Sequence, residues 1–404
     1  MKGLTMTTDA EDLKTQACSV IDSLASELIE ISHDIHDHPE LNFQEHYAAE
    51  RLARLATHHG LDTTIGAYGV ATGFAAQHGS GPTVAIVCEY DALPGIGHGC
   101  GHNVIGAAGI GAALAAAAVC DSAGGSVRLL GTPAEEGGGG KISMGRNGAF
   151  EDLSVAMMVH PADADLTTID AIAIQQLLVE YTGRASHAAA APQHGRNALD
   201  AAVMGYMGVA ALRQHIAPTE RVHGIFLKAG DKPNIVPRES SMDWYVRSDT
   251  ITSLQPLKQR VLACLEAGAL SCGCTMTHQW DDRPYADMLT NGPLVASFVT
   301  NSAALGRVVR DPRESGHAVV GSTDMGNVSH LVPSIHPMIA IAPPGTAIHT
   351  EEFAKYARST SADQAILDGA KAMVMTAIDF WTSAPKQALV AQVFSQENSS
   401  QDVL

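Results

Sequence analysis

Side chains of the kinds that bind metals lie beyond the ends of several apolar runs that are far apart in the chain. Four such runs have the length and composition of buried strands: Thr83–Cys88, Ser126–Gly131, Ser154–Val159 and Pro337–Ala342. Apolar runs without polar alternation, separated by helical segments, are typical of a mostly parallel sheet that is covered on both faces. Ligands bind where the carboxyl ends of parallel strands share one edge. We therefore expect the metal-type side chains near these ends to converge: Cys100, His102, Glu136, His160 and His349.

Thiolate, imidazole and carboxylate groups are ligands for zinc, and they also suit manganese or cobalt less selectively. A single tetrahedral zinc needs only three or four ligands, so five of them predict two divalent metal ions per chain that share a water. Such a water becomes a nucleophile near neutral pH. Of the two adjacent glutamates Glu135 and Glu136, one would then bind metal and the other would take the proton from water.

Each part of this pattern also has a plainer interpretation. A pair of adjacent glutamates is usually a solvated turn, and a lone histidine after a strand is usually packed in a core. Gly137–Gly140 followed by Lys141 resembles a phosphate loop, but Glu135 and Ile142 occupy the wrong positions for that motif. Cys272 and Cys274 form a C-x-C pair with no second pair nearby, so we interpret them as structural. The convergence of the whole set favours the metal site.

A chain of 404 residues is too long for one compact core, so two domains are expected. The pattern predicts an α/β catalytic domain, with a mostly parallel sheet, formed by residues 1–172 and 291–385. Between them, residues 173–290 show the order β-α-β-β-α-β, which predicts an inserted α+β, ferredoxin-like domain. The last stretch, residues 386–404, is polar and is predicted to be a frayed tail.

The formal net charge of -18 argues against nucleic-acid binding, because an acidic surface repels phosphate backbones. The first residues show no basic start followed by an apolar run, so no secretory signal is predicted. The apolar stretch Ile105–Cys120 is short and rich in Ala and Gly, which predicts a buried helix and no membrane association. Seven cysteines, an odd number, favour a reducing compartment, and we expect a cytoplasmic protein.

Several stretches together are similar to the aminoacylase and carboxypeptidase-G type dinuclear metallopeptidases. They are IHDHPELNFQE (35–45), CEYDALPGIGHGCGHN (88–103), GTPAEEGGGG (131–140), GRASHAAAAP (183–192), NIVP (234–237) and GSTDMGNVS (321–329). The branch that they resemble holds auxin-conjugate amidohydrolases, p-aminobenzoyl-glutamate hydrolase and β-alanyl-lysine dipeptidase-like proteins. The similarity spans about residues 20–380, and the motifs occur in the order of the family.

The resemblance implies roles for individual residues. It makes the five residues above the metal ligands, Glu135 the base and Asp91 a residue that orients a ligand. His187, in the inserted lid domain, would polarise the scissile carbonyl in a partner subunit's site, so a homodimer through that domain is expected. Asn234 and Arg247 would hold the substrate carboxylate, a task that suits the planar fork of arginine. The plainer alternatives are a histidine that serves only the lid and a surface arginine at a strand edge.

Two positions depart from the family pattern. Asn103 stands where close relatives usually have Asp. Glu89 stands where the wider family has a ligand histidine and this branch often has Asp. Both are expected to lie next to the metals, where neighbouring groups orient the ligands and tune the choice of metal.

The expected activity is hydrolysis of an amide bond in an N-acyl amino acid, an aminoacyl conjugate or an unusual dipeptide, releasing a free amino acid. An alternative makes Cys100 the nucleophile of an amidase and His102 its base, but it leaves Glu136, His160 and His349 without a role. A further alternative is a metal-binding or regulatory homologue that has lost catalysis. The retention of all five ligands and the base argues against it.

Overall fold

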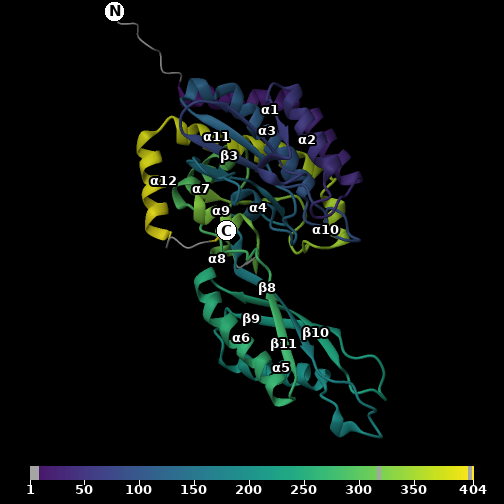
Figure 1. The fold of residues 1–404 in the computed structure, drawn as a ribbon. Coiled ribbons are helices and arrows are strands. Elements are labelled where there is room, and N and C mark those ends of the chain that lie inside the picture. The colour runs from purple at the N-terminus through teal and green to yellow at the C-terminus, as the bar shows by residue number, and fades with distance from the viewer. Residues whose placement is uncertain (1–8, 316–319, 399–402) are drawn as a thin grey trace, which may run out of the picture. The chain divides into compact units, whose positions relative to one another are not determined.

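The computed structural model describes residues 9–315, 320–398 and 403–404, which form two compact units (Figure 1). The larger unit contains the chain up to Asp170 and again from Met288, and the smaller unit is Ala171–Asp287. The sequence placed these two junctions after residues 172 and 290. The smaller unit is therefore an insertion between two parts of the larger one.

The larger unit is built on a six-stranded sheet. Its strands, in spatial order, are β1 (Thr64–Ile65), β2 (Phe74–Gly79), β4 (Ser126–Gly131), β3 (Thr83–Cys88), β5 (Val155–Met157) and β13 (Ser334–Ile335). The last four are mutually parallel, whereas β1 and β2 pair antiparallel at one side. The prediction of an α/β fold with a mostly parallel sheet is confirmed.

Both faces of this sheet are covered, which explains why its central strands show no polar alternation. On β3, Val84 and Ile86 join one apolar cluster while Ala85 and Val87 join another on the opposite face. The first cluster is formed largely by three helices that pack against one another: α1 (Ala10–Asp37), α3 (His102–Ala123) and α11 (Thr360–Trp381). The second lies beneath α4 (Gly140–Gly145) and α9 (Met325–Leu331).

Helix α3 contains the apolar stretch noted in the sequence, and it is a core helix of this unit. By length and composition it could cross a membrane, but 89% of its most apolar stretch is buried inside the protein. Gly109 allows its close approach to the sheet, since a Cβ there would lie 2.3 Å from the Sγ of Cys88. Small residues on α3 therefore serve contact with β3.

Two expectations about this unit need correction. The run Pro337–Ala342 does not supply a strand of the central sheet: Ser334–Ile335 forms β13, and β14 (Met338–Ala340) pairs in parallel with β6 (His160–Ala162) in a separate ladder. The end of the chain is not frayed over residues 386–397, because Ala384–Glu397 forms helix α12. Ser383 accepts a hydrogen bond from the backbone N–H of Lys386 at the start of α12, and Val390 is buried.

Shorter elements complete the larger unit. They are α2 (His46–His58), η1 (Ala67–Gly69), β7 (Asp170–Ala171), α7 (Gly292–Ala304), α8 (Pro312–Ser315), β12 (Val320–Gly321) and α10 (Glu351–Tyr356). Helix α12 packs against α7 and α11.

The smaller unit has the predicted element order. It contains β8 (Ala173–Thr182), η2 (Pro192–His194), α5 (Ala198–Leu212), η3 (Arg213–His215), β9 (Arg221–Lys228), β10 (Glu239–Ser248), α6 (Ile251–Ser271) and β11 (Thr275–Trp280). The four strands form an antiparallel sheet in the order β11-β8-β10-β9, and α5 packs against α6. Trp244 is fully buried in its core, and β9 forms one edge of its sheet.

Candidate metal centre

The five predicted ligands come together at the carboxyl edge of the parallel strands. Cys100, His102 and His160 place ligand atoms within 4.8 Å of one another, and so do Cys100, Glu136 and His349. The thiol of Cys100 belongs to both groups, so the arrangement offers two adjoining metal positions that share one sulfur ligand. The convergence predicted from the strand ends is present in the structure.

Cys100 and His102 flank the start of α3. Gly101 between them has a left-handed backbone with φ 75°, and a Cβ at that position would lie 2.9 Å from the side chain of Pro161. A glycine is therefore required for the chain to turn into α3 next to the segment that carries His160. This local requirement explains the spacing C-G-H in the sequence.

Asp91 connects two parts of the site. Its Oδ1 lies 3.0 Å from Nδ1 of His102, and its Oδ2 accepts a 2.9 Å hydrogen bond from the backbone N–H of Glu136. Burial opposes ionisation of this carboxyl group, but the neighbouring His102 holds its pKa below the usual range. One buried carboxylate thus fixes a ligand ring and the turn that bears the two glutamates, as a residue orienting a ligand must.

Several ligand atoms have no hydrogen-bond partner within the described parts of the chain. They are Nε2 of His102, Oε1 of Glu136 and, beside them, Oε2 of Glu89. A buried polar atom without a partner costs about 1–3 kcal/mol, and a bound cation would remove that cost. Burial and the nearby Glu136 raise the pKa of the Cys100 thiol well above its usual range. Such a thiol ionises readily only against a cation, so the donor set fits divalent metal ions.

Charge leads to the same conclusion. The acidic side chains buried or almost buried around the ligands are Glu89, Asp91, Glu135, Glu136 and Asp324. Lys141 is a fully buried lysine among them. An excess of buried negative charge is unfavourable without counter-charges, and two divalent cations would balance most of it.

Glu135 lies beside the ligands on the strained turn that follows β4. Its Oε2 is 3.9 Å from Nε2 of His102, and its side chain is 9% exposed. Ala134, which precedes it, has a left-handed backbone with φ 61°. Burial, together with the charges of Glu89 and Glu136, raises the pKa of Glu135 well above its usual range. A carboxyl group of this kind is suited to accept a proton and later return it.

His349 approaches the site from the loop after β14. It has a left-handed backbone with φ 64°, and its N–H donates to the carbonyl of Gly99 over 2.9 Å. Its Nε2 lies 3.4 Å from Oε1 of Glu136, and its side chain is 53% exposed. This predicted ligand therefore stands on the solvent side of the group, whereas His102 is fully buried.

Lys141 has a role in this site that no sequence pattern indicated. Its ammonium group lies 2.5 Å from Oε1 of Glu89 and 2.6 Å from Oδ1 of Asp324, with all three side chains fully buried. Burial alone would lower the pKa of Lys141, but Asp324 and Glu89 raise it. Asp324 stood in a quoted motif without an assigned role. Glu89, whose Oε2 is 3.6 Å from Nε2 of His102, does lie beside the ligands as expected.

Asn103 is fully buried and follows His102 directly in the chain. Its Nδ2 lies 2.8 Å from the carbonyl of Ala357 and 2.9 Å from Oγ of Ser32, so its NH₂ group joins α3 to α1 and to the end of α10. An ionised Asp at this position would have no hydrogen to donate to the Ala357 carbonyl, so this contact is specific to Asn.

A buried histidine near the ligands was also not anticipated from the sequence. His336 is buried beside His160, with a ring-centroid separation of 5.4 Å, and neither of its ring nitrogens has a hydrogen-bond partner in the described residues. Burial and the nearby His160 hold its pKa well below the usual range. It directly follows the carboxyl end of β13, the position where we expected ligand-type residues, but it lies in none of the motifs quoted above.

The remaining predicted site residues lie in the smaller unit. His187 is exposed, and its Nδ1 accepts a 3.1 Å hydrogen bond from the N–H of Ala190. The N–H of Ala188 donates to the carbonyl of Asn234, so the segments of His187 and Asn234 adjoin. Arg247 is half-buried on β10, 6.0 Å from the ring of Tyr245. The roles of these three residues stay predictions.

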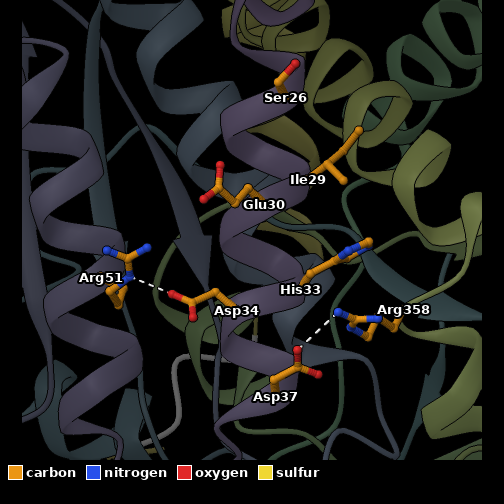
Figure 2. Close-up of a pocket in the computed structure, with 8 residues that line it drawn as sticks. All are labelled: Ser26, Ile29, Glu30, His33, Asp34, Asp37, Arg51 and Arg358. Carbon is orange, nitrogen blue, oxygen red and sulfur yellow. Dashed lines mark hydrogen bonds and ion pairs between the residues drawn. The ribbon is translucent and has the colours of Figure 1, made fainter.

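Figure 2 shows a separate polar groove along α1. It is lined by Ser26, Ile29, Glu30, His33, Asp34, Asp37, Arg51 and Arg358. Its charged groups are largely paired, with Arg51 2.6 Å from Asp34 and Arg358 3.1 Å from Asp37. None of the predicted ligands lines it, so we do not assign the chemistry to it.

Comparisons with known proteins agree with this picture. Residues 83–379 match the model of peptidase family M20/M25/M40. The chain is 39% identical to the Xaa-Arg dipeptidase of Mus musculus over 93% of this chain and 91% of that protein. It is 29% identical to one of the subunits of the p-aminobenzoyl-glutamate hydrolase of Escherichia coli, over 87% of this chain and 88% of that protein. A dinuclear metal-binding M20 peptidase of Bacillus subtilis has a similar fold, with a TM-score of 0.61 and 20% identity, over 85% of this chain and 98% of that one.

Proposed function

We propose where and on what this chain acts, given that it belongs to peptidase family M20/M25/M40 and hydrolyses amide bonds. It cleaves a dipeptide or acyl-amino acid at the centre around Cys100. The observation that carries this proposal is the sharing of the Cys100 thiol by two groups of ligand atoms, with Glu135 beside them. A shared ligand and an adjacent carboxyl group are what a two-metal hydrolase needs.

Cys100, His102 and His160 would hold one divalent ion, and Cys100, Glu136 and His349 the other. When bound, the ions would supply Lewis acidity, which lowers the pKa of water and polarises the amide carbonyl. Zinc is the ion that best suits a set of one thiolate, three imidazoles and one carboxylate, with manganese or cobalt as alternatives.

The protein's own groups then move the proton and orient the substrate. Glu135 accepts a proton from the attacking water and returns it to the leaving amine. In our proposal His187 donates a hydrogen bond to the oxygen of the tetrahedral species in the partner subunit's site, an interaction worth several kcal/mol in other hydrolases. Asn234 and Arg247 hold the free carboxylate of the substrate. Asp91 keeps the ring of His102 in place throughout.

The substrate is proposed to carry a basic residue at its C-terminal side. The most extensive similarity given above is to a dipeptidase named for Xaa-Arg substrates. The formal net charge of -18 also favours the approach of cationic substrates by long-range attraction. Competition between Ala-Arg, Ala-Lys, Ala-Glu and p-aminobenzoyl-glutamate tests this point, and a preference for the two acidic compounds would contradict it.

A homodimer is proposed through the smaller unit. The edge strand β9 exposes Ile225 (62%) and Leu227 (56%), and helix α5 exposes Met204 (52%) and Met207 (58%). Large apolar side chains grouped on an edge strand and a helix are usually covered by another protein surface. A second copy of the chain is the occupant that would also bring His187 to a site in trans. We further propose a cytoplasmic location, which agrees with seven free cysteines.

The test of the proposed function separates the two adjacent glutamates. Glu135→Gln should keep two metal ions per chain and lose turnover by a factor of 10³ or more, since it lacks a proton acceptor; general acid–base groups contribute roughly 10²–10⁴. Glu136→Gln should instead lose metal. Near-normal turnover in Glu135→Gln would refute the assignment of the base. A stable acyl-thioester on Cys100 would support the amidase alternative, and full metal content without hydrolysis in the wild type would support the non-catalytic one.

A further inference from the structure

The stretch IHDHPELNFQE (35–45) is similar to a motif of the family, but the proposed mechanism uses none of its residues. In the structure this segment touches each of three loops that carry site residues. The carbonyl of Ile35 accepts a 3.1 Å hydrogen bond from Nε2 of His98, close to the ligand Cys100. The carbonyl of Glu40 accepts a 2.8 Å hydrogen bond from the N–H of Ala92, next to Asp91. The third contact is made by Glu45.

Glu45 is fully buried, and its carboxylate accepts three hydrogen bonds. Its Oε1 accepts from the N–H groups of Phe43 (3.0 Å) and Ala134 (2.9 Å), and its Oε2 accepts from Oγ1 of Thr72 (3.0 Å). Phe43 and Ala134 both have φ 61°, in the left-handed region. Left-handed backbone is unfavourable for a residue with a Cβ, so it needs support from its surroundings.

Ala134 is the residue directly before Glu135 and Glu136. The conformation of Ala134 therefore sets where the proposed base and the ligand point. At the other end of this pair, the N–H of Glu136 is held by Asp91. The turn is thus fixed on both sides by buried carboxylates, Glu45 before it and Asp91 after it.

We propose that Glu45 is a positioning residue, which holds Ala134 in its left-handed conformation and so aims Glu135 and Glu136 into the metal centre. This inference rests on the proposed roles of Glu135 and Glu136. Glu45 itself lies outside the set of ligand atoms, and it acts through the backbone of the turn.

The test compares Glu45→Ala with Glu40→Ala in the full-length chain. Glu40 is a matched control, because its carboxylate also accepts two backbone hydrogen bonds, from Tyr47 and Ala48, but serves only the start of α2. Glu45→Ala is expected to lose 10- to 100-fold in zinc affinity, the usual effect of removing a group that orients a ligand. It should also lower kcat more than KM and speed amide exchange at Gly137 and Gly138. Glu40→Ala should lower the melting temperature while leaving zinc affinity within about threefold.

A double variant guards against a general loss of folding. Glycine adopts φ near 61° without strain, so Ala134→Gly should restore part of the zinc affinity and kcat when added to Glu45→Ala. Unchanged amide exchange and zinc affinity in Glu45→Ala would overturn the inference, and so would an absence of rescue by Ala134→Gly. Neither readout depends on Glu135 being the base, so a failure of that assignment would appear separately in Glu135→Gln.

Discussion

His102 is hydrogen-bonded through Nδ1 to Oδ1 of Asp91 over 3.0 Å, which leaves its Nε2 facing the other ligand atoms. The hydrogen bond to an ionised carboxylate selects the ring form that carries its proton on Nδ1. That form presents a free electron pair on Nε2, as a metal ligand must. A fully buried pair of side chains thus determines in advance which nitrogen binds metal.

Asp91→Asn should weaken metal binding by about 10- to 100-fold. The amide has one acceptor for two donors, Nδ1 of His102 and the N–H of Glu136, so its NH₂ group opposes one of them. Competition against a chelator of known affinity measures the loss. Asp34→Asn, which changes contacts with Arg51 and Tyr47 beside α1, is the control and should keep the wild-type affinity. Equal affinities for all three proteins would show that Asp91 does not orient the ligands.

Cys100→Asp should retain both metal ions in part and a measurable fraction of turnover, because a carboxylate can also bridge two divalent ions. Cys100→Ala should lose metal, and with it at least about 10²-fold in turnover. Metal analysis alongside kinetics separates the two variants, with Cys264→Ala as an inert thiol control. If Cys100 were a nucleophile, Cys100→Asp would be as inactive as Cys100→Ala while its metal content stayed normal.

Stability of the metal-free protein should depend on pH through Glu45. Burial and the nearby charge of Asp91 raise its pKa to about 7 in the folded state, against 4.5 in an unfolded chain. Between these values the folded state holds a proton that the unfolded state releases, so this contribution to stability falls as pH rises. Glu45→Gln does not titrate and should gain on the wild type by about 3 kcal/mol between pH 4.5 and 7.5. Parallel unfolding curves for the two proteins across that range would contradict the prediction.

Ile225→Arg should convert the proposed dimer into monomers. A charge at a 62% exposed position on the edge strand β9 costs little in the monomer, but it would be buried without a partner in the interface. Sedimentation velocity measures the change in mass. Leu270→Arg is the control, since Leu270 is 83% exposed on α6. A wild-type chain that sediments as a monomer, or an unchanged dimer in Ile225→Arg, would remove β9 from the interface.

The convergence of the proposed ligands could be predicted from sequence, because the carboxyl ends of parallel strands share an edge and this rule links residues far apart in the chain. Lys141 could not be predicted in the same way. Its role depends on α4 and α9 packing over the sheet so that one ammonium group meets Glu89 and Asp324. The residues next to Lys141 in the sequence do not indicate that it lies close to Glu89 and Asp324.

Helix α12 shows the opposite case, where a usable signal was overlooked. Ser383 precedes it and Pro385 stands in its first turn, which is the usual start of a helix. The polar composition of residues 386–404 concealed this signal.

The left-handed backbones of Ala134 and His349 set a limit for anyone who would engineer this enzyme for heat resistance. Glycine at either position would relieve local strain. At position 349 it would also remove a ligand, and at position 134 it would free the turn to sample other conformations. The left-handed backbone at these two positions thus lowers the stability of the folded chain, and it also holds the centre in place before substrate binds.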